Sequence, residues 1–472
     1  MTSQGVEMRK RCSKETMRGI LRGLVLLACA CGLLIESSTV SMAATGGGTP
    51  ARASKTAGLT SGPVINVWYG SPQKFGQEGV PQRWVNILGN VSTSNPPLSY
   101  LKYSLNGSDD VYLSVGPDTR RLAQSGDFNI DILTQYLSPG NNTVLITAQD
   151  NLGVSSTQSV TIKWTPGKVW PSMYTVKWSS ASSLSDSVQV VDGLWATDGG
   201  GVRTTQPGYD RIIAIGDTTW TDYEVQAQVY VHAIDNSDTA YDGTNGGPAV
   251  GFLFRWNGHT DMPTFVPPIT QPLSGYQPYG AIGWFHYRNH NPINQPDQWE
   301  LLGNSLADLG HDESSPLPIG VLYNFKMRVK SSTGGTYSFK AWPNGSSEPA
   351  SWLLSGSTGN SSDPTHGSFA LLAHHVDVSF GEVDVSPLGT LTTPTLVSPS
   401  NGSNGVFGGT ALVWNKVSTA GSYDVQVSTS SSFTSGMLVN QTGVRDTTAG
   451  HSAFSSPRAA RIACRAQTRA WD

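Results

Sequence analysis

The sequence predicts an all-β protein built from several domains. Only 14% of its 472 residues are charged, against roughly 25% in an average soluble protein. Its 52 glycines and 28 prolines supply many turn residues. Short runs of alternating apolar and polar residues recur along the chain with turn dipeptides between them, a pattern typical of β-sandwiches. The length suffices for about two to four domains.

The composition excludes three other classes of protein. The chain holds 14 tryptophans, 16 tyrosines and 13 phenylalanines, too many for a disordered acidic protein. It lacks the abundance of Ala, Glu, Lys and Leu that a coiled coil requires. The net charge of -4, with no basic block in the body of the chain, argues against a nucleic-acid partner.

Residues 1–44 are predicted to be a signal peptide. Basic residues come first, an apolar run over residues 24–35 follows, and small residues near Ala44 form a cleavage site. The apolar run is too short to span a bilayer, so we expect no transmembrane span in the mature chain. The basic residues are Arg9, Lys10, Arg11, Lys14, Arg18 and Arg22.

The cysteines agree with export. Three of them lie in the leader, Cys464 lies near the end, and none lies between residues 45 and 463. The body therefore has no disulfide framework and no cysteine-ligated zinc site. Residues 26–29 also fit a lipoprotein box with a lipid anchor at Cys29, although the apolar run continues past that residue. We expect a secreted or cell-surface protein of bacterial type.

After a linker at 45–60, residues 61–165 are predicted to form the first sandwich. Alternating runs recur there every 8–12 residues, the spacing of sandwich strands. The closing segment NTVLITAQDNLGVSSTQSVTIKW, at 142–164, resembles the final hairpin of bacterial immunoglobulin-like domains. The resemblance implies an Ig-like β-sandwich, for which we expect a spacer role.

Residues 392–450 are predicted to form a third, truncated unit. The segment TPTLVSPSNGSNGV, followed by Trp414 and Tyr423, resembles a fibronectin type III domain, in which these two side chains would lie in the core. The strand pattern stops after Gly450, so we expect an incomplete sandwich. Residues 451–472 form an arginine-rich, off-pattern tail without alternation, which we expect to be poorly ordered.

The middle unit, residues 166–388, carries the features that point to function. Nine of the 14 tryptophans lie in it. Residues 223–231 and 323–330 alternate cleanly between apolar and polar side chains, as expected for half-buried strands. Residues 281–288 differ, because alternation would place Trp284, His286 and Arg288 together on one sheet face. The nine tryptophans are Trp170, Trp178, Trp195, Trp220, Trp256, Trp284, Trp299, Trp342 and Trp352.

Three segments of this unit resemble the concanavalin A-like lectin/glucanase jelly roll, including laminin G-like modules. They are WTDYEVQAQVYV at 220–231, GPAVGFLFRWNG at 247–258 and GSFALLAHHVDVSFGEVDVSPL at 367–388. The resemblance implies two curved antiparallel sheets, a concave face that receives carbohydrate and, in many members, a calcium ion near the rim.

Carbohydrate recognition needs aromatic faces for the C–H patches of a sugar and polar groups for its hydroxyls. We therefore predict a carbohydrate-binding cluster, with polysaccharide or glycan as the partner of a monomeric protein. The alternative places the tryptophans in the core and the polar groups on solvated edges. The insertion at 257–279 is predicted to be a rim loop. The cluster comprises Trp284, His286, Arg288 and Arg255, joined by Glu224, Gln226 and Gln228 if their strands are neighbours.

Catalysis is not expected, although two enzyme classes remain alternatives. Retaining glucanases of this fold carry paired carboxylates on one strand. In the nearest string here, EVDVS at 382–386, Ser386 stands where the second glutamate of the pair would be. A polysaccharide lyase could use His286, Tyr287 and Arg288, but neighbouring residues on a strand point to opposite faces. A third possibility is an adhesin or matrix protein whose jelly roll binds protein.

One loop has the composition of a calcium site. Asp235, Asp238 and Asp242 lie in IDNSDTAYDGTNGG, which is rich in the oxygen ligands that calcium prefers. An acidic surface loop is the alternative, because the spacing is not that of an EF-hand. Ca2+ is the only cofactor that the sequence suggests.

Overall fold

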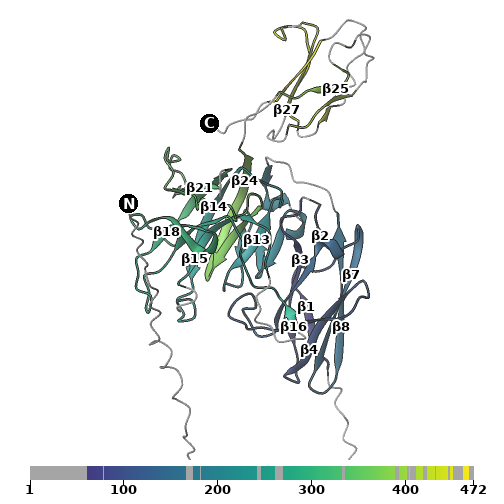
Figure 1. Ribbon diagram of the computed structural model, residues 1–472. Coiled ribbons are helices and arrows are strands. Elements are labelled where there is room, and N and C mark those ends of the chain that lie inside the picture. Colours follow the sequence, from purple (N-terminus) through teal and green to yellow (C-terminus); the bar gives the residue numbers. More distant parts are fainter. Residues whose placement is uncertain are drawn as a thin grey trace, which may run out of the picture. The chain divides into compact units, whose positions relative to one another are not determined.

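Strands account for nearly all regular structure in the computed structural model (Figure 1). The predicted signal peptide at 1–44 and the predicted linker at 45–60 lie outside the described residues. In the described part of the chain no helix is long and apolar enough to cross a membrane. The structure describes residues 61–77, 79–165, 174–180, 182–241, 246–260, 269–331, 335–388, 393–400, 403, 411–417, 423–430, 432–444, 447–449 and 461–466. Helical structure in these ranges is limited to the 3-10 turns η1 (Thr134–Tyr136), η2 (Trp178–Ser180), η3 (Leu184–Asp186) and η4 (Asn304–Leu306).

Two sheets form the first sandwich. Alternating apolar residues such as Ile87, Ile130 and Ile146 fill the space between them and are fully buried. One sheet has the order β1-β3-β6, with β1 at Val64–Val67, β3 at Trp84–Ser92 and β6 at Asp127–Leu133. The other has the order β16-β5-β4-β7-β8-β2, with β2 at Gln73–Phe75, β4 at Leu98–Leu105, β5 at Val111–Leu113, β7 at Gly140–Asp150, β8 at Ser155–Trp164 and β16 at Ile269–Gln271.

Strand β16 belongs to the 257–279 insertion of the central unit, yet it pairs in parallel with β5 of the first sandwich (Figure 1). The Gln271 side chain also bonds to β6, in the other sheet of the first sandwich. It accepts from the backbone N–H of Asp131 at 2.8 Å and donates to the carbonyl of Asp131 at 2.9 Å. The insertion is therefore more than the predicted rim loop, because it also adds a strand to a neighbouring sheet.

The central sandwich consists of two larger antiparallel sheets. The seven-stranded sheet has the order β10-β13-β23-β15-β17-β18-β19, with β10 at Gln189–Asp192, β13 at Arg211–Ile215, β15 at Ala249–Trp256, β17 at Ala281–His286, β18 at Gln298–Gly303, β19 at Ala307–Asp312 and β23 at Ser368–His374. The eight-stranded sheet has the order β11-β12-β24-β14-β20-β21-β22, with β9 paired to β24. Its strands are β9 (Tyr174–Val176), β11 (Trp195–Thr197), β12 (Val202–Thr204), β14 (Tyr223–Ile234), β20 (Leu322–Lys330), β21 (Thr336–Pro343), β22 (Leu354–Gly356) and β24 (Val376–Pro387).

Both faces of the seven-stranded sheet carry apolar side chains. Phe252 and Phe285 point into the main core, where Phe252 packs edge to face on Phe325 of the eight-stranded sheet. Their neighbours in alternation, such as Leu253 and Trp284, belong to a second apolar cluster. Since successive side chains of a strand point to opposite faces, this second cluster lies on the outer face of the sheet. An outer apolar face of this kind is a natural floor for a binding site.

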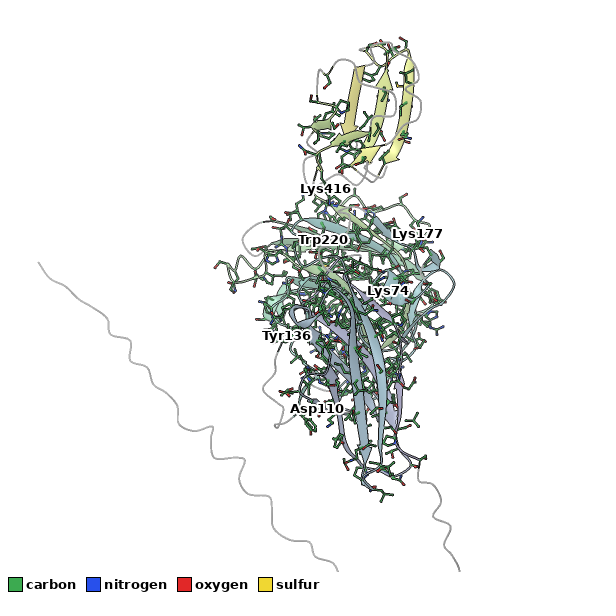
Figure 2. The ribbon with its side chains drawn as sticks, turned by 90° about the vertical axis from the view of Figure 1, so that its right-hand side faces the viewer. Lys74, Asp110, Tyr136, Lys177, Trp220 and Lys416 are labelled. Atoms are coloured by element: carbon green, nitrogen blue, oxygen red, sulfur yellow. The ribbon has the colours of Figure 1, made fainter. Side chains whose placement is uncertain are left out.

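The first and central sandwiches make many contacts. Leu88 of β3 belongs to the main core of the central sandwich, and Lys74 of β2 forms an ion pair of 2.6 Å with Asp186. In Figure 2, Asp110 lies well below Lys74, and its partner Lys102 belongs to the first sandwich itself. The central core therefore extends into the neighbouring unit.

The C-terminal unit forms two three-stranded sheets. Trp414 and Tyr423 pack edge to face in its core, with 5.3 Å between ring centroids. The tail at 451–472 is predicted to be poorly ordered, and six of its residues, Arg461–Ala466, form β30, which pairs with one edge of β27. The sheets have the orders β25-β26-β29 and β28-β27-β30, with β25 at Leu396–Ser398, β26 at Leu412–Trp414, β27 at Tyr423–Ser428, β28 at Met437–Val444 and β29 at Thr448–Ala449.

Candidate functional site

A cavity of about 890 Å³ lies against the outer face of the seven-stranded sheet. Its floor comes from side chains of β15, β17, β18 and β23, namely Leu253, Ile282, Trp284, Leu302 and Leu372. The insertion after β15 contributes Ser274, Gly275, Tyr276, Gln277 and Tyr279, and the connection between β17 and β18 contributes Pro292, Ile293 and Gln295. The cavity falls within the size range of small-ligand sites, which are typically about 300–1,000 Å³.

Strand β17 supplies the floor because of its alternation. Ile282, Trp284 and His286 line the cavity, whereas Phe285 points into the main core. Arg288, two residues beyond the strand, continues the series and also lines the cavity. The structure thus brings together the three residues of this strand region that the sequence grouped on one face.

Glu300 of β18 is the polar centre of this half of the cavity. It accepts hydrogen bonds from Trp284 Nε1 at 2.6 Å and from Gln298 Nε2, and His286 Nδ1 lies 3.1 Å away. The guanidinium of Arg288 lies 3.5 Å from its other oxygen. Burial alone would raise the pKa of Glu300, but the hydrogen bonds from His286, Gln298 and Trp284 outweigh it and the pKa is lowered. Glu300 is therefore an ionised anchor that fixes Trp284 and His286.

A second polar pair, His374 with Asp210, lies in the same cavity. His374 Nδ1 is 2.8 Å from Asp210 Oδ1, and the imidazole packs edge to face on Tyr209, with 5.0 Å between ring centroids. His374 is 3% exposed, and its Nε2 has no hydrogen-bond partner within the described residues. The carboxylate of Asp210 favours the tautomer with the proton on Nδ1, so Nε2 presents a lone pair.

Tyr276, another lining residue, also carries an unsatisfied buried polar atom. Its ring packs against His259 at 4.6 Å and lies 6.2 Å from Tyr209. Its hydroxyl is buried without a hydrogen-bond partner in the described part of the chain. Burial raises the pKa of Tyr276 well above its usual value, so the hydroxyl keeps its proton and can donate.

The first sandwich contributes one side chain to the cavity. Arg120, from the loop between β5 and β6, lies over the ring of Tyr209, with 5.2 Å from its guanidinium carbon to the ring centroid. Arg120 Nη1 also donates to Tyr209 Oη at 3.2 Å. The two sandwiches therefore both border this site.

Arg255 lies elsewhere, contrary to the predicted cluster. A register shift between Phe254 and Trp256 interrupts the alternation of β15, and Arg255 has φ of 50°. Its guanidinium consequently donates to the backbone carbonyls of Thr221 and Pro364, and Trp256 turns to the outer cluster. The prediction failed because it assumed unbroken alternation.

The three residues of β14 also lie apart from the cavity. Strand β14 pairs with β20 and β24 in the eight-stranded sheet, so it is no neighbour of β17. Glu224 binds Arg328 at 2.6 Å, and Gln228 donates to Asn344 at 3.1 Å. Gln226, two residues from each, shares their polar face. Glu224, Gln226 and Gln228 were predicted to join the cluster only if their strand neighbours that of Trp284, and the two strands lie in different sheets.

Several lining residues were missed by the sequence interpretation. Glu300 could have been found from the sequence, because it is the one carboxylate in the apolar strand QWELLG and a buried glutamate normally has a polar partner. His374 is buried and also lines the cavity. Asp210, Tyr276 and Arg120 come from loops or strand ends, where no local pattern predicts a common site.

The predicted calcium ligands are not assembled by the described residues. Asp235 accepts from the Ser237 backbone at 2.9 Å and lies 3.3 Å from His375 Nδ1, while Asp242 lies outside the described residues. Asp238 is an exposed loop residue. The described ranges contain no group of three or more His, Cys, Asp or Glu that could hold a metal ion. A calcium site at this loop stays a prediction.

Comparisons with known proteins found no matching family model and no matching curated protein. Among solved structures, the chain is similar to a protein of unknown function with a galectin-like fold from Bacillus subtilis, at 15% identity over 40% of this chain and 88% of that one, with a TM-score of 0.27. It is also similar to a structure described under carbohydrate-binding modules of the beta-sandwich superfamily, at 12% identity over 69% of this chain and 96% of that one, with a TM-score of 0.15.

Proposed function

We propose that the chain is an exported surface protein that binds carbohydrate in the cavity over β17 and β18. One observation carries the proposal. Two buried polar atoms without partners among the described residues, His374 Nε2 and Tyr276 Oη, belong to residues that line a cavity, and Trp284 lines the same cavity. Buried polar atoms are normally satisfied, so both atoms favour a polar ligand.

A sugar fits this combination of groups. Each hydroxyl both donates and accepts, so it can donate to the lone pair of His374 Nε2 and accept from the hydroxyl of Tyr276. Its C–H patches can lie on aromatic rings such as those of Trp284 and Tyr279. Apolar ligands would leave both polar atoms unsatisfied, at a cost of about 1–3 kcal/mol each.

The state of the carboxylates favours binding over hydrolysis. Glu300 is held ionised by its donors, which leaves it poorly suited to act as a proton donor. Asp384, in the string nearest to a glucanase motif, accepts from Thr175 Oγ1 at 2.6 Å on the eight-stranded sheet, away from the cavity. A polysaccharide hydrolase or lyase, and a protein-binding adhesin, remain alternatives that the experiment below can detect.

The test is a glycan array with the full chain, since Arg120 of the first sandwich also lines the cavity. We expect retention on a subset of glycans and a loss of at least about tenfold in affinity for Trp284→Ala, because aromatic stacking and burial of this size contribute that much. The matched control is Trp352→Ala, which removes a half-buried indole that packs on Arg328 outside the cavity.

Two outcomes would overturn the proposal. The first is no retained glycan at high protein concentration. The second is an equal loss for Trp352→Ala and Trp284→Ala in chains of equal thermal stability. A parallel array with chelator tests the predicted Ca2+ dependence, and release of reducing ends or unsaturated products from a bound polysaccharide would point to the enzyme classes.

A further inference from the structure

Arg120 is held in place by an unusual set of buried contacts. Its neighbour Arg121 has a fully buried side chain that reaches Asp131 at 2.8 Å and Asp192 at 2.5 Å. From the central sandwich, Arg211 of β13 donates to the backbone carbonyls of Arg121 at 2.9 Å and Arg120 at 3.3 Å. The backbone of Arg120 is thus fixed by both sandwiches, which is the preorganisation expected of a recognition residue.

Arg120 and Arg288, the two arginines of the cavity lining, differ in whether a carboxylate pairs with the guanidinium. Arg288 lies 3.5 Å from Glu300, which compensates its charge. For Arg120, no carboxylate of the described residues lies within 4.0 Å of the guanidinium, whose described side-chain partner is Tyr209 Oη. Asp210, on the same wall, lies 2.8 Å from His374 and also hydrogen-bonds Tyr209, the side chain that Arg120 contacts. Arg120 therefore brings to the cavity lining a positive charge that forms no ion pair within the described residues.

We infer that the first sandwich forms part of the binding site and that Arg120 selects a glycan bearing a carboxylate, that is, a uronic acid. This inference rests on the proposed carbohydrate function. A guanidinium has five donors in a planar fork that matches a carboxylate, and Tyr209 accepts from only one of them. The aromatic face under the guanidinium also restricts its motion, so less side-chain entropy is lost when the ligand binds.

The remaining groups of this wall complete the recognition of a uronate. His374 Nε2 and Tyr276 Oη both belong to residues whose rings contact or approach that of Tyr209, on which Arg120 rests. In this inference a single sugar ring offers its carboxylate to Arg120 and its hydroxyls to His374 and Tyr276. The first sandwich is therefore assigned a role in specificity, beyond that of a spacer.

The test uses the full chain and matched ligands. Oligogalacturonate, alginate oligosaccharides and hyaluronan fragments are titrated by calorimetry beside their carboxyl-reduced forms, which keep the ring but lose the charge. We expect at least one acidic form to bind about tenfold or more tightly than its reduced form, since a charge-assisted hydrogen bond contributes about that much. The difference should shrink as salt rises.

Four variants test whether the preference for the acidic glycan depends on Arg120. Arg120→Gln should abolish the preference for the acidic form, and Arg120→Lys should restore part of it, because lysine keeps the charge without the fork. Tyr209→Phe removes the acceptor that positions Arg120 and should give a smaller loss. Lys163→Gln is the control, since it removes an exposed positive charge from the same sandwich outside the cavity.

The possible results distinguish failure of the uronate inference from failure of the proposed carbohydrate function. Equal affinity for acidic and reduced forms, retention of neutral glycans only, or a preference that survives Arg120→Gln would overturn the inference and leave the proposed function standing. An equal loss for Lys163→Gln would also overturn it, because the effect would then be one of net charge. Absence of any glycan binding, acidic or neutral, would remove the proposed function itself.

Discussion

Nε of Arg121 lies 2.5 Å from Oδ1 of Asp192, and neither side chain has any exposed surface. The pair joins the first sandwich to the central one. Asp131 binds the same guanidinium at 2.8 Å, and His259 Nε2 lies 2.7 Å from the second oxygen of Asp192. Such a network stabilises a structure only while all its members are present, because each ion is costly to bury alone.

Removal of the central cation should therefore be strongly destabilising. Arg121→Met leaves Asp131 and Asp192 buried without their main partner, and we expect a loss of about 3–5 kcal/mol in the free energy of unfolding. Urea denaturation measures it. The control is Lys102→Met, which breaks the more exposed pair with Asp110 and should cost less than about 1 kcal/mol. Equal losses for the two variants would contradict the role assigned to the network.

Mild acid should destabilise the protein through His375. Burial lowers the pKa of this imidazole to about 4, with a further contribution from His374, while Asp235 at 3.3 Å acts in the opposite direction. Because the unfolded chain binds the proton near pH 6.5, the stability from this group is present above that pH and is lost as the pH falls toward 4. At pH 5 the loss should be about 2 kcal/mol relative to pH 7.

His375→Asn isolates this contribution. Asparagine tolerates the positive φ of 53° at this position and does not titrate. The variant should lose less stability than the parent chain between pH 7 and pH 5 in chemical denaturation. The same slope in both proteins would show that other groups cause the acid sensitivity.

Loss of the Glu300 charge should weaken ligand binding. Glu300→Gln leaves Trp284, His286 and Arg288 without the carboxylate that orients them, so we expect about tenfold lower affinity for a retained glycan and a stability cost of about 1–3 kcal/mol. Calorimetric titration measures the affinity. Glu382→Gln, at an exposed position of β24, serves as the control and should leave the affinity unchanged. A normal affinity for Glu300→Gln would refute the positioning role.

Gly283 should tolerate no side chain. A Cβ at this position would lie 2.8 Å from Phe339 Cδ2 and 2.9 Å from Met327 Sδ, because β17 packs closely on the opposite sheet. We expect Gly283→Ala to cost about 1–3 kcal/mol through overpacking. Gly200→Ala is the matched control, since a Cβ there meets no atom within 4 Å. Thermal melts of the two variants should differ clearly, and coincident melts would contradict the packing argument.

Local alternation predicted those parts of the site that depend on a single strand. It placed Trp284, His286 and Arg288 on one face, and all three line the cavity. It failed at Arg255, where one residue with positive φ reverses the side-chain direction and exchanges the positions of Arg255 and Trp256. A bulge of this kind leaves little trace in the order of apolar and polar residues.

Features that depend on contacts between distant segments could not be predicted in this way. The assignment of β14 and β17 to different sheets follows from strand order, which alternation does not encode. The pairing of Asp210 with His374 joins residues 164 positions apart in the chain. Arg120 reaches the cavity from another sandwich, so no pattern within the central unit indicates it.

The pairing of β16 with β5 has a consequence for the evolution of this architecture. Sandwich units are commonly exchanged as modules when recombination cuts the chain between them. Here a cut between the first and central units would separate β16 from its partner strand and leave Arg211 and Asp192 without their opposite groups. The two units are therefore expected to be inherited as a pair and to unfold in one cooperative transition, whereas the C-terminal unit can be exchanged or lost without breaking these contacts.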